Sequence, residues 1–324
     1  MKIVVLDGYA LNPGDISWED VEAFGDLQVY DRTGYDKSCQ SLVVERAEGA
    51  DILLTNKTPV LEEAMDALPD LKYIGVLATG YNIVDVEAAK RRGVIVSNIP
   101  TYGTASVAQM AIALMLELCH HVGAHGDAVK NGEWSDNPDW SFWKFPLIEL
   151  KGKSLGIVGF GRIGQATASI AKALGMEILV HTPHPKEVQG LEEVHYVLLE
   201  ELFQQSDFIS LHCPLNPETK GMINRNTISM MKDGVRIINT SRGPLIAEND
   251  LAQALENGKV AGAALDVVSA EPIKKDNPLL ISPNCIITPH ISWAPIEARR
   301  RLMKLTADNI RHYLKGSPIN VVNA

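Results

Sequence analysis

Cysteines are few in this sequence, and none of them stands in a pair. The four residues, Cys39, Cys119, Cys213 and Cys285, are widely separated and form no CxxC motif. A disulfide framework and a cysteine-bound structural metal are therefore not expected. This pattern predicts a reduced, cytoplasmic protein without a metal.

The sequence also lacks a long uninterrupted apolar run. The longest one, residues 107–119, contains Gln109 and Glu117 and is too short to cross a bilayer. The apolar start of the chain is too short for a signal peptide and fits a first strand instead. We therefore expect no membrane partner.

Positive charge is in deficit, since 30 lysines and arginines face 40 acidic residues and the formal net charge is -10. An acidic surface disfavours binding to nucleic acid and to anionic membranes, although it leaves room for a local basic pocket that binds a small anion. The remaining composition is that of an ordinary globular protein, with 46% hydrophobic residues. At 324 residues the chain is long enough for two domains.

One glycine-rich stretch is the most informative part of the sequence. A short apolar strand at 155–158 leads into Gly-x-Gly-x-x-Gly, and a helical pattern and a further strand at 176–181 follow. Gly159 permits a tight turn, Gly161 lets the backbone approach a pyrophosphate, and Gly164 lets helix and strand pack closely. This order predicts a dinucleotide-binding site rather than an ordinary glycine-rich turn.

Short apolar runs alternate with helical patterns on both sides of that motif, which predicts parallel sheets covered by helices. The other predicted strands are residues 2–6, 27–30, 51–55, 73–77, 94–97, 207–211, 235–239, 260–265 and 285–288. A loop at 98–103 marks a boundary, and a long amphipathic helix at 296–315 should return the chain to the first lobe. We expect a discontinuous domain of residues 1–100 and 293–324, and a second domain of residues 101–292.

Two apolar segments follow the predicted boundary. Ser106 and Gln109 fit a capping box for the apolar helix, which should be covered on nearly all sides, between the lobes or at a subunit contact. Aromatic side chains then crowd into the irregular segment 134–150. Such a segment predicts a surface covered by a second copy of the chain or, equally, by its own lobe.

Polar side chains of catalytic type follow three predicted strands. His290 suits proton transfer to a carbonyl oxygen, and Glu271 would orient its imidazole and raise its pKa. Arg242 would clamp a substrate carboxylate with its planar fork. Each residue alone has an ordinary structural interpretation, but the ends of parallel strands share one crevice. We expect the three side chains to meet over a nicotinamide ring between the lobes.

The ordered motifs resemble the D-isomer-specific 2-hydroxyacid dehydrogenase family over essentially the whole chain. The resemblance rests on residues 159–164, 212–215 with 219–221, 239–243, 266–272 and 288–290. It implies an α/β fold, with a Rossmann-type dinucleotide-binding domain and a flavodoxin-like parallel-sheet substrate domain. It also implies that Arg242, Glu271 and His290 are the catalytic set, with hydride passing between nicotinamide C4 and substrate C2.

The resemblance implies binding residues as well. Those expected at the cofactor are Thr104, Gly159, Phe160, Gly161, Arg162, Ile163, Gly164, Thr182, His212, Cys213, Pro214, Thr219, Thr240, Ser241, Arg242 and Asp266, with Asp266 at the nicotinamide end. Those expected at the substrate are Ala78, Thr79, Gly80, Arg242, His290 and Trp143, with backbone N–H groups of the 77–82 loop facing the substrate carboxylate. Either Trp140 or Trp143 is expected to reach the active site of a neighbouring subunit in a homodimer.

The end of the strand at 176–181 departs from the common family pattern. NAD-specific members usually carry an aspartate there that binds the ribose hydroxyls, and here the position is Thr182. Repulsion of a 2′-phosphate is then absent, and His184 or Lys186 would attract one, although no arginine is present to clamp it. The expected cofactor is NAD, with NADP as an alternative.

Within the family, residues 78–82, 106–109 and 142–143 look most like the glycerate dehydrogenases, also called hydroxypyruvate reductases. We therefore expect a cytoplasmic homodimer that reduces hydroxypyruvate, and glyoxylate as a second substrate, to the D-2-hydroxy acid with NAD(P)H. His290 would be the proton donor and acceptor. The alternatives are a D-lactate-type or other 2-oxo acid reductase, and a dinucleotide-sensing corepressor of the same fold.

Overall fold

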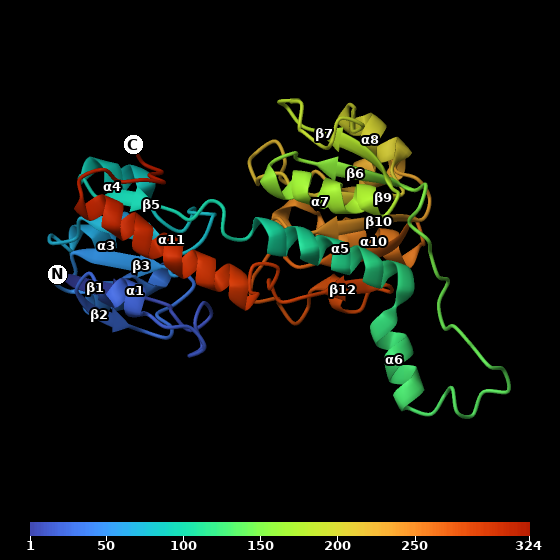
Figure 1. Cartoon of the computed structure of the whole chain (residues 1–324), viewed down its shortest axis with the longest axis horizontal. Coiled ribbons are helices and arrows are strands. Elements are labelled where there is room, and N and C mark those ends of the chain that lie inside the picture. The colour runs from blue at the N-terminus through green and yellow to red at the C-terminus, as the bar shows by residue number, and fades with distance from the viewer. The chain divides into compact units, whose positions relative to one another are not determined.

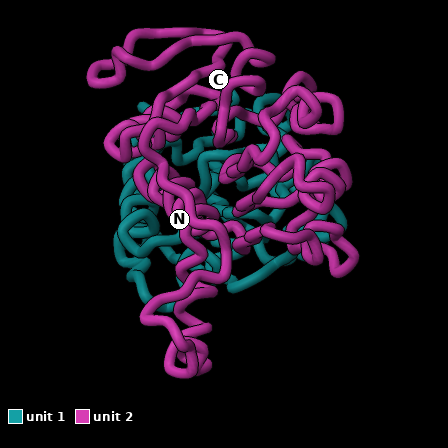
Figure 2. Tube along the Cα trace, turned by 90° about the vertical axis from the view of Figure 1, so that its right-hand side faces the viewer, with its two compact units in different colours: residues 1–103, 294–324 teal, residues 104–293 magenta.

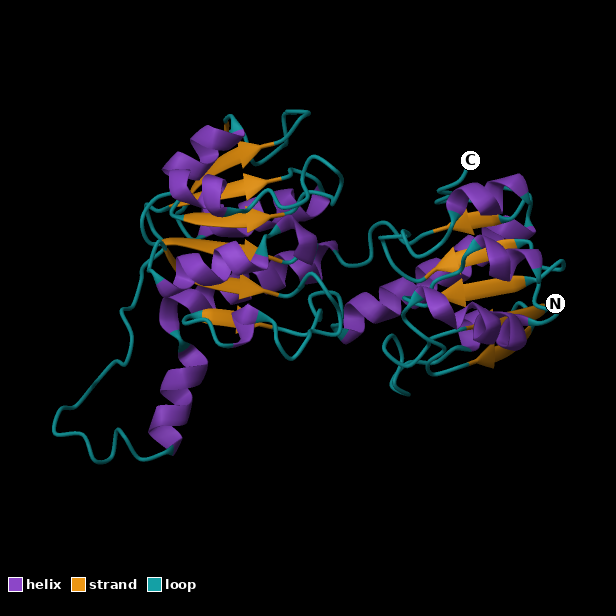
Figure 3. Cartoon of the chain, turned by 180° about the vertical axis from the view of Figure 1, so that it is seen from behind, coloured by secondary structure: helices purple, strands orange, loops and turns teal.

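The computed structural model describes residues 1–324 and divides the chain into two compact units. Unit 1 comprises Met1–Gly103 and Ala294–Ala324, and unit 2 comprises Thr104–Trp293 (Figure 2). Each unit is a parallel sheet with helices on both faces (Figure 3). The expected α/β class is confirmed.

Unit 1 contains a five-stranded sheet in the order β2-β1-β3-β4-β5, which is the flavodoxin-like order. Its strands are β1 (Lys2–Val5), β2 (Asp26–Val29), β3 (Ile52–Thr55), β4 (Tyr73–Val76) and β5 (Ile95–Ser97). All four residues of β3 and of β4 are buried. Burial on both faces explains why the sequence of these central strands is an apolar run rather than an alternation.

Helices cover both faces of this sheet. They are α1 (Glu19–Glu22), α2 (Gln40–Ala47), α3 (Glu62–Asp66), α4 (Val86–Arg91) and α11 (Ile296–Leu314), with a 3₁₀ turn at Lys37–Cys39. One apolar cluster joins α2, α3 and α4 to the sheet. The C-terminal helix α11 packs against α1 and β4, so the chain returns to unit 1 at its end (Figure 1).

Unit 2 contains a seven-stranded sheet in the order β12-β11-β10-β9-β6-β7-β8. Its strands are β6 (Ser154–Val158), β7 (Glu177–His181), β8 (His195–Tyr196), β9 (Phe208–Leu211), β10 (Val235–Asn239), β11 (Val260–Leu265) and β12 (Cys285–Ile287). The first six strands along the chain have the Rossmann order, and β12 adds one strand at the edge. The strand order reverses between β6 and β9, where such folds bind their ligands.

Two layers of helices cover the unit 2 sheet. They are α5 (Thr104–His120), α6 (Val122–Lys130), α7 (Arg162–Ala173), α8 (Leu199–Gln205), α9 (Arg225–Met230) and α10 (Glu248–Glu256), with 3₁₀ turns at Gly243–Leu245 and Pro278–Leu280. One apolar cluster contains α5, α7 and one face of the sheet, and another contains α8, α9, α10 and the opposite face. Alternate residues of the strands other than β8 enter the two clusters, as the period of a strand requires.

The predicted capping box at the start of α5 is wrong. The helix begins at Thr104, so that Ser106 is a buried residue inside it and not a cap. Burial on nearly all sides is also not observed within unit 2. One side of α5 packs on α7, β10 and β11, whereas Gln109 and Ala113 are exposed on another side.

Helix α6 and the irregular segment after it form an arm, residues 121–149, that projects from the rest of unit 2 (Figure 1). Trp140 and Trp143 on the arm are 88% and 67% exposed, so they do not pack against the chain's own lobe. No single helix combines the length and hydropathy that a membrane span needs, and only α5 and α6 counted together, across a 56° bend, reach them.

Candidate active site

The glycine loop follows β6 and leads directly into α7. Gly159 has a φ of 95°, and a side-chain carbon there would lie 2.6 Å from the backbone nitrogen of Cys213. A side-chain carbon on Gly164 would lie 2.3 Å from the Gly159 carbonyl oxygen. At Gly161 no atom lies within 4 Å of that position, so the backbone there is open to a ligand. The loop therefore has the three glycine properties that a pyrophosphate site needs.

Two segments at the ends of neighbouring strands lie beside this loop. After β9, the His212 N–H donates to the Val158 carbonyl, and after β10, the Ser241 hydroxyl donates to the Cys213 carbonyl at 2.7 Å. The Thr240 hydroxyl is buried and has no hydrogen-bond partner in the protein. A buried polar atom without a partner is costly, and a bound dinucleotide would supply one. The residues at this edge of the sheet therefore fit the expected cofactor.

The remaining expected cofactor residues are spread over the same unit. Phe160 is buried with its ring edge-on to Tyr196 at 5.9 Å, Arg162 and Ile163 form the first turn of α7, and Thr104 begins α5. The Thr219 hydroxyl donates to the Pro214 carbonyl at 2.7 Å and so closes the loop after β9. Thr182 follows β7, and no acidic residue occupies the strand end there.

His212 is held in its neutral form. Its Nε2 lies 2.9 Å from the Ser210 hydroxyl, and burial lowers the pKa of the imidazole to about 4. A partly buried imidazole without an acidic partner prefers to be uncharged, because desolvation disfavours the cation. At neutral pH this ring adds no charge beside the glycine loop.

Glu271 and His290 form the central pair of the site. His290 Nδ1 lies 2.7 Å from Glu271 Oε2, and both side chains remain partly accessible. With Glu271 ionised, Nδ1 carries the proton that the carboxylate accepts, and Nε2 is left to exchange a proton with a ligand. The expected orientation of the imidazole by the carboxylate is thus present in the geometry.

A buried carboxylate, Asp266, holds the loop that carries His290. It accepts hydrogen bonds from the Thr288 hydroxyl at 2.5 Å, from the backbone of Ile291 at 2.9 Å and from the backbone of Ser292 at 2.8 Å. The Ser292 hydroxyl donates to it as well. His290 sits within these contacts with a φ of 54°, a conformation that few residues other than glycine adopt without support.

Sequence reasoning missed this positioning role of Asp266, and it assigned no role to the neighbouring Thr288 and Ser292. The partners lie 22 to 26 residues further along the chain, so local patterns do not connect them. The available signal was the pair of hydroxyl residues that flank His290 at the end of a strand. Hydroxyls at such positions commonly fix a loop by hydrogen bonds.

Arg242 lies on the loop after β10 and forms no ion pair with an acidic residue. Its Nη1 donates to the Ser241 carbonyl at 2.8 Å, and the Asn239 side chain donates to the Arg242 carbonyl at 2.9 Å. A side-chain carbon at the next residue, Gly243, would lie 1.9 Å from the carbonyl carbon of Val268. The arginine loop therefore packs directly on the loop that runs from Asp266 to Glu271, in the same unit as His290.

Ala78, Thr79 and Gly80 follow β4 in unit 1. The Thr79 hydroxyl donates to the Ile99 carbonyl at 2.8 Å, and the Asn98 side chain donates to the Thr79 carbonyl at 2.7 Å. These bonds fix the loop, while the backbone N–H groups of Thr79 and Gly80 donate to no group of the protein. Such N–H groups at the end of a strand can receive an anion.

Comparison with known proteins shows close relatives. The family description "D-isomer specific 2-hydroxyacid dehydrogenase, NAD binding domain" matches residues 112–292. The chain is 59% identical to a hydroxypyruvate reductase of Blautia hydrogenotrophica over the full length of both, and 39% identical to a glycerate dehydrogenase of Methylorubrum extorquens over 87% of this chain and 88% of that protein. An acyclic imino acid reductase solved with NADPH and D-Arg is 30% identical, with a TM-score of 0.86, over 99% of this chain and all of the other.

Proposed function

The chain belongs to the D-isomer-specific 2-hydroxyacid dehydrogenase family, and on that premise we propose that it reduces hydroxypyruvate, and glyoxylate as a second substrate, to the D-2-hydroxy acid. It is an oxidoreductase that uses NAD, with NADP as an alternative. The observation that carries the proposal is the 2.7 Å pair of His290 and Glu271, in the unit that also contains the glycine loop and an Arg242 without an ion pair.

The cofactor is held by the carboxyl edge of the unit 2 sheet. The open backbone at Gly161 and the first turn of α7 would hold the pyrophosphate, and the Thr240 hydroxyl would gain the partner that it lacks. When bound, the reduced cofactor supplies the hydride for C2 of the oxo acid. Thr182 leaves the end of β7 without a carboxylate, which supports use of NAD and of NADP.

His290 supplies the proton that the reduction needs. As C2 takes the hydride, its carbonyl oxygen gains negative charge, and Nε2 of a protonated His290 donates to that oxygen. Glu271 stabilises the protonated ring through Nδ1 and fixes its orientation. In the reverse direction the neutral ring removes the hydroxyl proton.

Arg242 and the loop at 78–80 hold the substrate. The guanidinium has no acidic partner in the protein, so its fork is available to the carboxylate of the oxo acid and polarises the neighbouring carbonyl. In unit 1, the free backbone N–H groups of Thr79 and Gly80 suit a carboxylate as well. Both elements select 2-oxo acids over simple ketones.

The arm supports a homodimer. Val122, Trp134, Trp140, Trp143 and Leu147 are all at least half exposed, and aromatic groups of this kind are usually covered by a partner. A second copy of the chain is the proposed partner, with Trp140 or Trp143 reaching its active site. Gel filtration with light scattering should give a dimer, and Trp140→Ala with Trp143→Ala should weaken it; a wild-type monomer at working concentrations would contradict this.

The absorbance of NADH and NADPH gives the direct test of the reaction. The protein is mixed with each reduced cofactor and with hydroxypyruvate, glyoxylate, pyruvate and bulkier 2-oxo acids, and kcat/KM is compared across the panel. The highest value is expected for hydroxypyruvate. Preference for pyruvate would assign a D-lactate-type activity instead, and absence of turnover with every oxo acid would leave a cofactor-sensing corepressor as the better reading.

A further inference from the structure

A cavity of about 310 Å³ lies at the edge of the unit 2 sheet opposite to the glycine loop. It opens at the amino ends of β6, β9 and β10, where Lys153, Asp207 and Lys232 precede the strands and Arg236 is the second residue of β10. The glycine loop, Arg242 and Asp266 follow the carboxyl ends of the same sheet. The cavity is therefore separate from the candidate active site.

The charges that line this cavity do not balance. Asp207 accepts from Lys232 Nζ at 3.0 Å, and Asp233 is paired with Lys259 at 2.7 Å. Both acidic residues are thus already neutralised. Lys153 and Arg236 form no ion pair, so two positive charges remain on a chain whose net charge is -10.

Of these two cations, Arg236 gives the stronger indication of an anion site. Its guanidinium is partly buried above the Phe208 ring, 5.7 Å from the ring centre, and it donates one hydrogen bond inside the protein, to the Gly234 carbonyl. A guanidinium has five N–H donors, and burial without a carboxylate costs free energy unless other partners are present. Burial lowers the pKa of Arg236, and the nearby Asp207 carboxylate offsets that effect only in part.

We propose that this cavity binds a small dianion, of the phosphate monoester or dicarboxylate type. Arg236 and Lys153 supply two charges for its two, and the arginine fork suits phosphate and carboxylate oxygens alike. Ile148, which is partly exposed, offers apolar surface for a few carbon atoms. The cavity volume is at the small end for metabolite sites, which excludes a dinucleotide. This inference does not depend on the proposed reaction.

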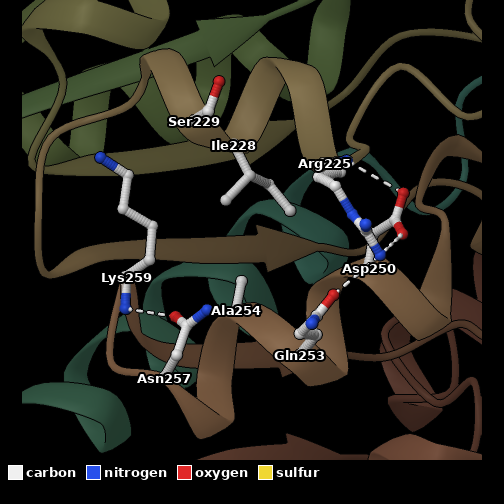
Figure 4. A pocket seen from close by; sticks show the side chains of 8 residues that line it. All are labelled: Arg225, Ile228, Ser229, Asp250, Gln253, Ala254, Asn257 and Lys259. Atoms are coloured by element: carbon white, nitrogen blue, oxygen red, sulfur yellow. Dashed lines mark hydrogen bonds and ion pairs between the residues drawn. The ribbon is translucent and has the colours of Figure 1, made fainter.

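A larger cavity of about 480 Å³ between α9 and α10 gives the contrast (Figure 4). Its arginine, Arg225, lies 3.8 Å from Asp250 and donates to Gln253 at 2.8 Å. Its lysine, Lys259, is paired with Asp233 and donates to the Met231 carbonyl. Both cations already have partners in the protein, so this second cavity has no free positive charge for an anion. Its arginine therefore supplies the control variant, Arg225→Gln.

Calorimetric titration of the NADH-bound protein tests the proposal. Inorganic phosphate and malonate are the dianion probes, and acetate and chloride at matched ionic strength are the controls. Phosphate or malonate is expected to bind with a stoichiometry of one per chain, and Arg236→Gln and Lys153→Gln should each weaken that binding by roughly tenfold or more. Arg225→Gln should leave it unchanged. The preferred probe identifies the phosphate or the dicarboxylate source.

Three outcomes would overturn the proposal. They are no dianion binding to the wild-type protein, equal weakening by Arg225→Gln, and binding that Arg242→Gln removes while Arg236→Gln does not, since the last places the anion in the active site. Lys153→Gln keeps the test valid if Arg236→Gln fails to fold, because Lys153 makes no side-chain hydrogen bond in the protein. Loss of turnover with intact dianion binding would count against the proposed function alone.

Discussion

The two units hold a buried carboxylate in equivalent places but use it differently. In unit 1, Asp7 is 2% exposed and accepts from the backbone of Asn56, Lys57 and Thr58. In unit 2, Asp266 is 1% exposed and fixes the 288–292 loop. Each carboxylate follows a strand and anchors a loop from another part of its sheet. The anchored loop carries the proposed proton-transfer group, His290, in unit 2 alone.

The architecture that the two units share does not decide which of them carries the candidate catalytic side chains. Both sheets are parallel, both order their loops at the carboxyl ends, and both fix a loop with an acid. Unit 2 places Arg242, Glu271 and His290 on such loops, whereas unit 1 offers the backbone N–H groups of Thr79 and Gly80. Changes in unit 2 should therefore lower kcat, and changes in unit 1 should act mainly through KM or stability.

The largest effect is expected for His290→Gln. Loss of the proton donor should reduce kcat by about 10²- to 10⁴-fold, while NADH affinity stays within about twofold of the wild-type value. Steady-state kinetics and fluorescence titration of NADH measure the two quantities. Thr79→Ala in unit 1 is the contrasting variant and should raise KM more than it lowers kcat. Equal loss of kcat in both variants would break the comparison.

Exchange of the two buried carboxylates for amides gives the next effect. In Asp266→Asn, one of the two oxygens that accept hydrogen bonds from four donors is replaced by an NH₂ group. The His290 loop should then lose its position, so kcat should fall by about 10- to 100-fold, and the free energy of unfolding should fall by about 1–3 kcal/mol. Asp7→Asn should cost stability of the same order but retain most of kcat. Steady-state kinetics and urea unfolding of both variants provide the measurement. An unchanged kcat in Asp266→Asn would show that Asp266 does not position His290.

Glycine substitutions sharpen the assignment of the cofactor to unit 2. Gly161 has a φ of -72°, which alanine adopts without strain, and nothing in the protein would contact the added carbon. Gly161→Ala should therefore weaken NADH binding by roughly tenfold at nearly unchanged stability. Gly126→Ala in α6, where the added carbon is also free of contacts, is the control and should leave NADH binding unchanged. Equal NADH affinity in both variants would argue against a pyrophosphate at Gly161.

The last expected effect concerns stability alone, whose pH dependence should have opposite signs in the two units. The folded-state pKa of His212 is lowered to about 4, so stability from the neutral ring is lost as pH falls from about 6.5 towards 4, by ~1–3 kcal/mol. The pKa of Asp7 is raised by burial, so its contribution is lost as pH rises above the unfolded value.

Urea unfolding at a series of pH values separates these two contributions. His212→Gln should flatten the acid side of the stability profile, and Asp7→Asn should flatten the decline that starts just above the ordinary carboxylate pKa. Each variant should leave the stability unchanged in the pH range that the other one affects. If His212→Gln leaves the profile between pH 4 and 6.5 unchanged, the imidazole is not held neutral in the folded protein.

Strong local patterns were sufficient for much of the fold. The apolar runs became strands within one or two residues of their predicted bounds, because burial on both faces leaves little choice of residue type. Helix α6 was missed because Gly123 and Gly126 weaken its helical pattern, and β8 was missed because it has two residues. The start of α5 was misplaced because hydroxyl residues inside and before a helix look alike in sequence.

The sequence by itself determined the two parallel sheets and the glycine loop, and it singled out Arg242, Glu271 and His290 as candidates, since each depends on local pattern or on residue chemistry. Tertiary structure alone decided which groups touch. The contact of Gly243 with Val268 and the bonds from Asp266 to the His290 loop join segments about 25 residues apart. Strand register and loop packing set those contacts, and both arise from interactions across the sheet that no local pattern records.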